Sequence, residues 1–219
     1  MTIATDLNAI KAQIRKQVRR RRKALTPQQQ TQAGRDISNK ISQLTTDSPS
    51  GAIKPLPIKP LRVALFLSMD GEIDTHNAIT TLWQQGVEVY LPRIHPFSST
   101  HLIFLRFEKN TPLVKSPLGM QEPQLNCSQL CPLSQLDIIF TPLVAFDARC
   151  QRLGMGGGFY DRTLAPIFRT NTTSAASSQA SSPKIIGLAH DCQQVDNIPT
   201  QPWDLPLEQI ITPKHHIKL

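Results

Sequence analysis

The chain has 219 residues, enough to bury a hydrophobic core in a domain of mixed α/β type. Its hydrophobic fraction of 39% excludes a fibrous or wholly disordered class, and no apolar run reaches the roughly 20 residues that a membrane-spanning helix needs. A formal net charge of +8 suits nucleic acid, an anionic membrane surface or small anionic substrates, and composition cannot choose among the three.

Two helices are predicted at the N-terminus. The apolar residues of 5–25 recur at three-, four- or seven-residue spacing, as expected for a helix that buries one face: Leu7, Ile10, Ile14, Val18 and Leu25. Four cations recur at spacings of four, four and three, and form a second face beside it: Lys11, Arg15, Arg19 and Arg22. Thr26 and Pro27 are a helix start signal, and the second helix is predicted to reach about Leu44.

The rest of the chain alternates between strand and helix signals. Residues 45–60 are rich in proline and predict an exposed loop, and 170–183 predict a flexible Ser-rich insertion. Asp74 and Thr75 can cap a helix that ends at Gly86, and another helix is predicted over 158–168. Short apolar runs predict strands at 62–67, 87–91, 102–107, 137–141, 184–189 and 208–211. We therefore expect a single α/β domain over 1–219, with a mostly parallel sheet flanked by helices and an N-terminal helical pair.

A run of glycines is the strongest functional signal. Within five residues, between a predicted strand and a predicted helix, lie Gly154, Gly156, Gly157 and Gly158. Glycine lets a backbone approach a ligand closely, and successive N–H groups ahead of a helix N-terminus bind phosphate oxygens. Arg152 and Arg162 flank the run, and Asp161 is a carboxylate of the type that holds magnesium beside phosphates. The residues alone predict a phosphate-binding loop with a metal-binding carboxylate.

This loop matches neither of two common nucleotide-binding motifs. No Gly-Lys-Ser/Thr follows it, which excludes a Walker A loop, and Phe159 stands where a dinucleotide fingerprint has its third glycine. Residues 137–164, DIIFTPLVAFDARCQRLGMGGGFYDRTL, instead resemble the signature of the 5-formyltetrahydrofolate cyclo-ligase family. The segments 11–15, 66–75, 185–189 and 204–210 resemble further family segments in the family's order.

The resemblance implies an enzyme that uses ATP and magnesium to convert 5-formyltetrahydrofolate into 5,10-methenyltetrahydrofolate, ADP and phosphate. It implies ATP contacts from Lys11, Arg15, Arg152, Leu153, Gly154, Met155, Gly156, Gly157, Gly158, Phe159 and Tyr160. It implies a folate pocket formed by Leu67, Glu72, Met155, Gly156, Gly157, Gly158 and Phe159. Arg152 and Tyr160 are expected to act in catalysis, and Asp161 and Glu208 to hold magnesium.

Two positions depart from the commoner family pattern. Glu208 stands where an Asp is usual, so nearby Asp204 is an alternative metal ligand, and Phe159 replaces a Tyr. Stacking on folate or adenine survives the second change, because the ring is retained.

Other classes of function remain open. A nucleic-acid-binding protein would use the basic run at 19–22, but no aromatic residue for base stacking precedes Phe66. A homologue that binds its ligands without catalysis is a second alternative. We expect the cations at 19–23 to form a solvated face, because they point all round the helix. We also expect a cytoplasmic monomer that binds small molecules rather than nucleic acid or membrane, with its four cysteines reduced.

Overall fold

The computed structural model describes residues 2–46, 59–173, 182–201 and 204–219. Its helices are α1 (Thr2–Lys23), α2 (Pro27–Thr46), α3 (His76–Gln84) and α4 (Phe159–Thr173). Short 3₁₀ helices lie at Cys127–Gln129, Leu133–Gln135 and Asp191–Gln193. Within the described ranges, no helix is both long enough and apolar enough to cross a membrane.

One large sheet organises the described part of the chain. Its strands follow the order β12-β11-β10-β7-β1-β2-β3-β6. The five inner strands are parallel: β11 (Gln209–Ile211), β10 (Lys184–Leu188), β7 (Ile138–Pro142), β1 (Arg62–Ala64) and β2 (Glu88–His95). The antiparallel strands at the edges are β12 (His216–Lys218), β3 (Ser98–Arg106) and β6 (Leu130–Cys131). Two small antiparallel pairs stand apart: β4 (Leu113–Lys115) with β5 (Gln121–Pro123), and β8 (Ala145–Phe146) with β9 (Arg152–Leu153).

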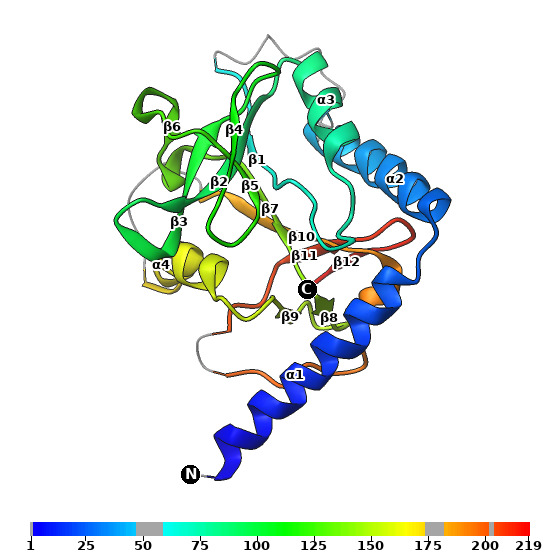
Figure 1. Cartoon of the computed structure of the whole chain (residues 1–219). Coiled ribbons are helices and arrows are strands. Elements are labelled where there is room, and N and C mark those ends of the chain that lie inside the picture. The colour runs from blue at the N-terminus through cyan, green and yellow to red at the C-terminus, as the bar shows by residue number, and fades with distance from the viewer. Residues whose placement is uncertain (1, 47–58, 174–181, 202–203) are drawn as a thin grey trace.

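Helices cover both faces of this sheet (Figure 1). On one face, α2 and α3 bury Ile37, Ile41 and Leu82 against strand residues such as Phe140. On the other face, α4 buries Leu164 and Ile167 together with Ile139, Ile185 and Ile210. Burial of apolar area on both faces makes the inner strands continuous apolar runs, as the sequence predicts.

Helix α1 packs in a third apolar cluster, separate from those of α2 with α3 and of α4, and lies along the β8–β9 pair (Figure 1). Val18 is fully buried among Val144, Leu153 and Ile198, and this contact anchors the middle of the helix. The first helix therefore packs beside the end of the sheet at which β7 and β10 finish.

Most of the predicted elements are confirmed, and the differences lie at their ends. The strand expected over 62–67 ends at Ala64, because the chain then leaves the sheet for a turn. The strands expected over 87–91 and 102–107 are longer and form an antiparallel hairpin. Thr75 is the N-cap residue of α3, but its hydroxyl donates to the Phe66 carbonyl instead of capping, and Asp74, one residue earlier, accepts from the His76 N–H at 3.0 Å.

Two predicted loops fall partly outside the described ranges. Helix α2 continues to Thr46, so the loop expected from residue 45 begins later, and its residues 47–58 are not described. Helix α4 continues to Thr173 rather than ending at Phe168, and residues 174–181 of the expected insertion are not described.

Candidate active site

A cavity of about 160 Å³ opens at the carboxyl ends of the parallel strands. Its walls include Phe66 and Leu67 after β1, Leu91 in β2, Leu143 after β7, and the glycine loop that leads into α4. Ligands bind at this end of open α/β sheets. Complete small-molecule sites measure roughly 300–1,000 Å³, so the enclosed volume is smaller than that of a complete small-molecule site.

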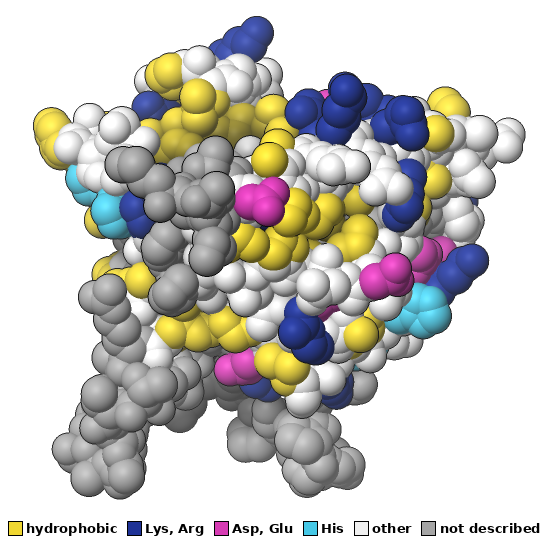
Figure 2. Space-filling view, turned by 90° about the horizontal axis from the view of Figure 1, so that it is seen from below, with side chains coloured by type: hydrophobic (Ala, Val, Ile, Leu, Met, Phe, Trp, Pro, Cys, Tyr) yellow, Lys and Arg dark blue, Asp and Glu magenta, His cyan; other side chains and the backbone are white. Residues whose placement is uncertain are grey.

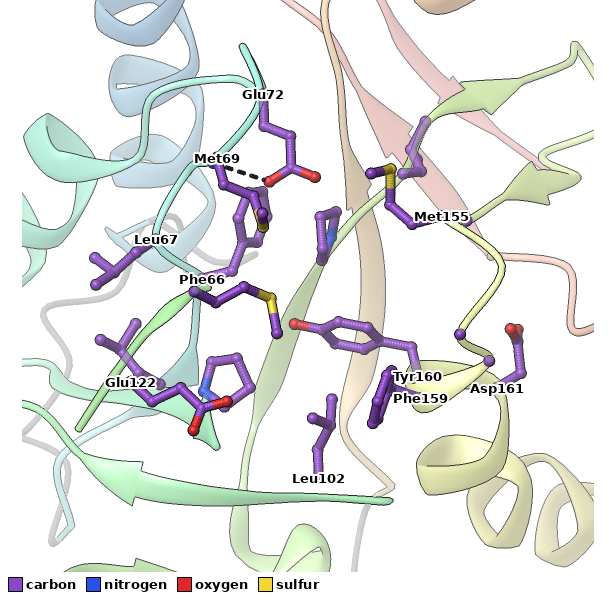
Figure 3. Close-up of a pocket in the computed structure, with 18 of the residues that line it drawn as sticks. Phe66, Leu67, Met69, Glu72, Leu102, Glu122, Met155, Phe159, Tyr160 and Asp161 are labelled. Carbon is purple, nitrogen blue, oxygen red and sulfur yellow. Dashed lines mark hydrogen bonds between the residues drawn. The ribbon is translucent and has the colours of Figure 1, made fainter. Parts of the chain in front are cut away.

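A tight turn carries Glu72 to the cavity. Asp70 and Gly71 have φ of 51° and 74°, and the Glu72 N–H donates to the Met69 carbonyl at 2.9 Å. Two consecutive positive φ values define a type I′ turn, for which Asp-Gly is a favoured pair. The Glu72 carboxylate accepts from the Met69 N–H at 3.2 Å and faces the cavity (Figure 3). Burial raises the pKa of Glu72 to about 7.

The basic end of α1 packs against this turn. Arg19 and Arg22 donate to one Asp70 oxygen at 2.7 and 2.9 Å, and Lys23 lies 2.8 Å from the other. These cations, with the Arg19 hydrogen bond foremost, hold the pKa of Asp70 well below its usual range. The expectation of a solvated face at 19–23 is therefore wrong for Arg22, which an acidic turn distant in sequence covers, whereas Arg19 and Lys23 stay partly or largely exposed while they pair with that turn. Arg22 is fully buried.

The glycine run forms an open loop ahead of α4. Gly156 and Gly158 have φ of 106° and 65°, which only glycine adopts without strain. The Arg15 guanidinium donates to the Gly154 carbonyl at 2.8 Å. A Cβ atom added at Gly156 would lie 3.7 Å from the central carbon of that guanidinium. Arg162 donates to the carbonyls of Gly157 and Thr100 and so fixes the end of the loop. The structure thus brings Arg15 to the predicted phosphate loop.

Lys11 lies one helical turn before Arg15 and makes a different contact. Its ammonium is buried, 2.5 Å from an Asp204 oxygen and 3.2 Å from the Gln201 side-chain oxygen. Asp204 also accepts from the Gln201 N–H at 2.8 Å and acts electrostatically on Arg15. Lys11, Arg15 and Asp204 therefore form one charged group beside the loop.

The predicted catalytic pair meets at the start of α4. Arg152 is buried and donates to Asp161 at 2.5 Å, and its guanidinium carbon stands 5.9 Å from the centre of the Tyr160 ring. The Tyr160 hydroxyl points into the cavity and has no hydrogen-bond partner within the described ranges (Figure 3). Burial, with Glu72 contributing, raises the pKa of Tyr160, so this hydroxyl keeps its proton.

The three candidate metal ligands differ in their surroundings. Asp161 lines the cavity, and Asp204 stands beside Lys11. Glu208 is exposed and does not line the cavity. Among the residues that the structure describes, no three His, Cys, Asp or Glu side chains cluster as a metal cage.

The β4–β5 pair contributes a wall that the sequence did not indicate. Glu122 is buried at the cavity, accepts from the Ile94 N–H at 3.2 Å and lies 3.8 Å from Arg93. Met120 precedes it in the same wall. Residues 121–123, Gln-Glu-Pro, contain no apolar run and end in proline, so no strand signal marks this wall in the sequence.

The surface reflects the excess of positive charge. Figure 2 shows several Lys and Arg side chains gathered at the upper right of one face, whereas the acidic side chains visible there are fewer and more scattered. Such a distribution favours anionic ligands.

Comparisons with known proteins agree with one another. A family model described as the 5-formyltetrahydrofolate cyclo-ligase family matches residues 8–213. The 5-formyltetrahydrofolate cyclo-ligase of Escherichia coli K12 is 42% identical over 196 residues, which make up 90% of this chain and 96% of the relative. The enzyme of the same name from Haemophilus influenzae is 43% identical over 199 residues, with coverages of 91% and 95%.

Solved structures extend the likeness to the fold. A 5,10-methenyltetrahydrofolate synthetase from Mycoplasma pneumoniae aligns over 93% of this chain and 98% of its own, with a TM-score of 0.65 and 24% identity. A second one, from Aquifex aeolicus, aligns over 95% and 92%, with a TM-score of 0.69 and 24% identity. At these identities the structural likeness concerns the fold alone.

Proposed function

Because this chain belongs to the 5-formyltetrahydrofolate cyclo-ligase family, we propose that it uses ATP to convert 5-formyltetrahydrofolate into 5,10-methenyltetrahydrofolate, ADP and phosphate. The observation that carries the proposal is one cavity lined both by the glycine loop and by Glu72. A reaction between a folate oxygen and the γ-phosphate requires the two ligands to meet in such a shared site.

The chemistry proceeds in two steps. The formyl oxygen attacks the γ-phosphorus, the bond from that phosphorus to ADP breaks, and an imidate phosphate forms at N5. N10 then attacks the formyl carbon and loses its proton, and phosphate leaves as the ring closes. Neither step needs a nucleophilic side chain, so the residues of the site act by positioning and by stabilising charge.

The nucleotide subsite is formed by α1 and the glycine loop. Arg15 already lies on the loop, and Lys11 stands one turn away with its charge directed to Asp204. The phosphates are held by these cations and by backbone N–H groups of the loop, with Arg152 available to the transferred phosphoryl group. The further residues of this subsite are Leu153, Gly154, Met155, Gly156, Gly157, Gly158, Phe159 and Tyr160.

The folate subsite is formed by the opposite wall. The Glu72 carboxylate accepts hydrogen bonds from the N–H groups of the pterin, and the unpaired Tyr160 hydroxyl donates one to the substrate. Leu67 lines the same cavity as Met155 and Phe159, which stand beside the glycine loop. Their apolar contacts complete the subsite for the flat ring.

Magnesium fits the acidic residues that are present. This ion takes one or two carboxylates together with phosphate oxygens and keeps several waters, so a protein cage of three ligands is not required. When bound, it neutralises charge on the phosphates. We infer that Asp161 and Asp204 hold the ion. Each is paired with a cation of the nucleotide subsite, Asp161 with Arg152 and Asp204 with Lys11. Neither Asp204 nor Glu208, the other candidate, lines the cavity, but Asp204 is half-buried and Glu208 is exposed.

The test of the function is direct. Purified protein is incubated with ATP, magnesium and 5-formyltetrahydrofolate, and methenyltetrahydrofolate is followed by its absorbance. We expect product only when both ATP and the folate are present. No product at ample enzyme contradicts the proposal.

A matched pair of variants tests the second metal ligand. Asp204→Asn should raise the magnesium concentration needed for half-maximal rate by about tenfold or more, because a charged ligand is lost. Glu208→Gln should leave that concentration unchanged. Titration of each variant with magnesium at saturating ATP measures this, and the reverse result assigns the role to Glu208.

A further inference from the structure

Arg22 occupies an unusual position for a cation. Its side chain has no exposed surface, and one of its terminal nitrogens is paired with Asp70 at 2.9 Å. The Nε and the other terminal nitrogen have no hydrogen-bond partner in the part of the chain that the structure describes. Burying an incompletely paired charge destabilises a protein, so a cation in this position needs a compensating role.

The Arg22 side chain packs against the Met69–Glu72 turn. A Cβ placed on Gly71 would lie 3.8 Å from the Arg22 Cγ and 3.9 Å from its Nε, so the side chain lies directly under the turn. Asp70, which Arg22 holds, is two residues before Glu72. The left-handed pair Asp70 and Gly71 then turns the chain so that Glu72 faces the cavity.

We propose that Arg22 is a positioning residue for folate binding: through Asp70 it fixes the Met69–Glu72 turn and sets the charge environment of the Glu72 carboxylate. This inference rests on the proposed function, since it assigns Glu72 to the pterin. Arg22 itself touches no substrate.

Burial is the largest influence on the pKa of Glu72, followed by the hydrogen bond from the Met69 N–H, and four ionisable groups surround the carboxylate. Arg22 of α1 favours the carboxylate, whereas Asp70 in the same turn disfavours it. Tyr160 of α4 stays protonated, and His190 after β10 lies against the backbone of Gly71 and Glu72. Burial, with Arg22 contributing, lowers the pKa of His190, so its ring is neutral at neutral pH. Arg22 and Asp70 are therefore the two charges that act on Glu72 in opposite directions.

The test measures the Kd of 5-formyltetrahydrofolate by calorimetry from pH 6 to 9, without ATP and hence without turnover. In the unmodified protein, binding should weaken as pH falls through the pKa of Glu72, about 7. Arg22→Gln should move this transition to higher pH by about one unit, because a cation that stabilises the carboxylate is lost. Asp70→Asn should move it to lower pH. Arg22→Lys, which keeps the charge, should leave it close to its original position.

The KM values for folate and ATP are measured as well, together with a control variant. Both Arg22→Gln and Asp70→Asn should raise the KM for folate by about tenfold, because the Met69–Glu72 turn is no longer held in place. The KM for ATP should change less than about twofold. Arg20→Gln, an exposed neighbour on the same helix, is the control and should change neither value. A His190→Gln background keeps that ring from contributing to the transition.

The opposite shifts distinguish positioning from simple support of the fold. If both variants weaken binding but leave the transition in place, or move it in the same direction, the inference is wrong. If Arg22→Gln does not fold, Asp70→Asn alone decides: a transition at lower pH than in Arg22→Lys, the charge-conserving control, supports the inference, and an unchanged or higher one contradicts it. Failure of the function itself shows separately, as absence of methenyltetrahydrofolate from unmodified protein that binds folate normally.

Discussion

At the scale of single residues, Glu72 connects folding to binding. Its pKa of about 7 in the folded protein exceeds the ordinary value of 4.5, because burial disfavours the charged form. Between these two pH values the folded state keeps a proton that the unfolded state has released. The contribution of Glu72 to stability is therefore complete below pH 4.5 and is lost as pH rises to about 7.

We predict that Glu72→Gln removes this part of the pH dependence. The unmodified protein should lose about 2–3 kcal/mol more stability than the variant between pH 4.5 and 8. Chemical denaturation at a series of pH values measures the difference. Parallel stability curves for the two proteins would mean that Glu72 titrates in the folded state as it does in water.

Tyr160 and Tyr90 form a matched pair for a second prediction. Among the described residues the Tyr160 hydroxyl, at the cavity, has no hydrogen-bond partner, whereas the Tyr90 hydroxyl lies away from the cavity and donates to Glu88 at 2.8 Å. Tyr160→Phe should leave stability unchanged or raise it, yet lower kcat/KM for folate by about tenfold, since a ligand contact is lost. Tyr90→Phe should do the opposite, costing about 1 kcal/mol without changing the KM.

Thermal unfolding and steady-state kinetics measure both tyrosine variants. A loss of stability in Tyr160→Phe would show that its hydroxyl supports the fold rather than the ligand.

At the scale of elements, the glycine loop requires a backbone that other residues cannot adopt. Gly156→Ala places a side chain at φ 106°, which strains the backbone, while the added Cβ stands in ordinary contact 3.7 Å from Arg15, so relief of the strain shifts the loop. We predict an increase of about tenfold or more in the KM for ATP, because phosphate contacts depend on position within about 0.5 Å. Gly86→Ala, at φ 75° in open space after α3, is the control. It should cost about 1 kcal/mol of stability and leave the KM for ATP unchanged. Equal KM values in the two variants would contradict the role of the loop.

The elements also show what could be predicted from the sequence. The inner strands and the first helix can be recognised from their apolar residues, the next two helices from their start and cap signals, and the glycine loop from its glycines alone. Glu122 could not be predicted, because its wall depends on short strands that pair only in the folded chain. The contact of Arg22 with Asp70 spans 48 positions, and a run of cations looks the same whether solvent or a distant carboxylate faces it.

At the scale of the whole molecule, the site is assembled from segments far apart in the chain. Lys11, Glu72, Gly156 and Asp204 come from four separate parts, so ligands that contact them bind only the folded state. We predict that ATP with magnesium stabilises the protein by about 2.7 kcal/mol at a hundredfold excess over Kd. Thermal unfolding with and without ATP measures this. Arg15→Met should abolish most of the shift at the same ATP concentration, and an unchanged shift would exclude Arg15 from the nucleotide subsite.

Helix α1 has a consequence beyond its individual contacts. Arg15 holds the glycine loop, and Arg22, seven residues later, holds the turn that carries Glu72. Because a helix rises about 1.5 Å per residue, these two contacts lie about 10 Å apart along the axis of α1. In the proposed function, the length of this stretch of helix would fix the distance between the glycine loop of the nucleotide subsite and the turn of the folate subsite.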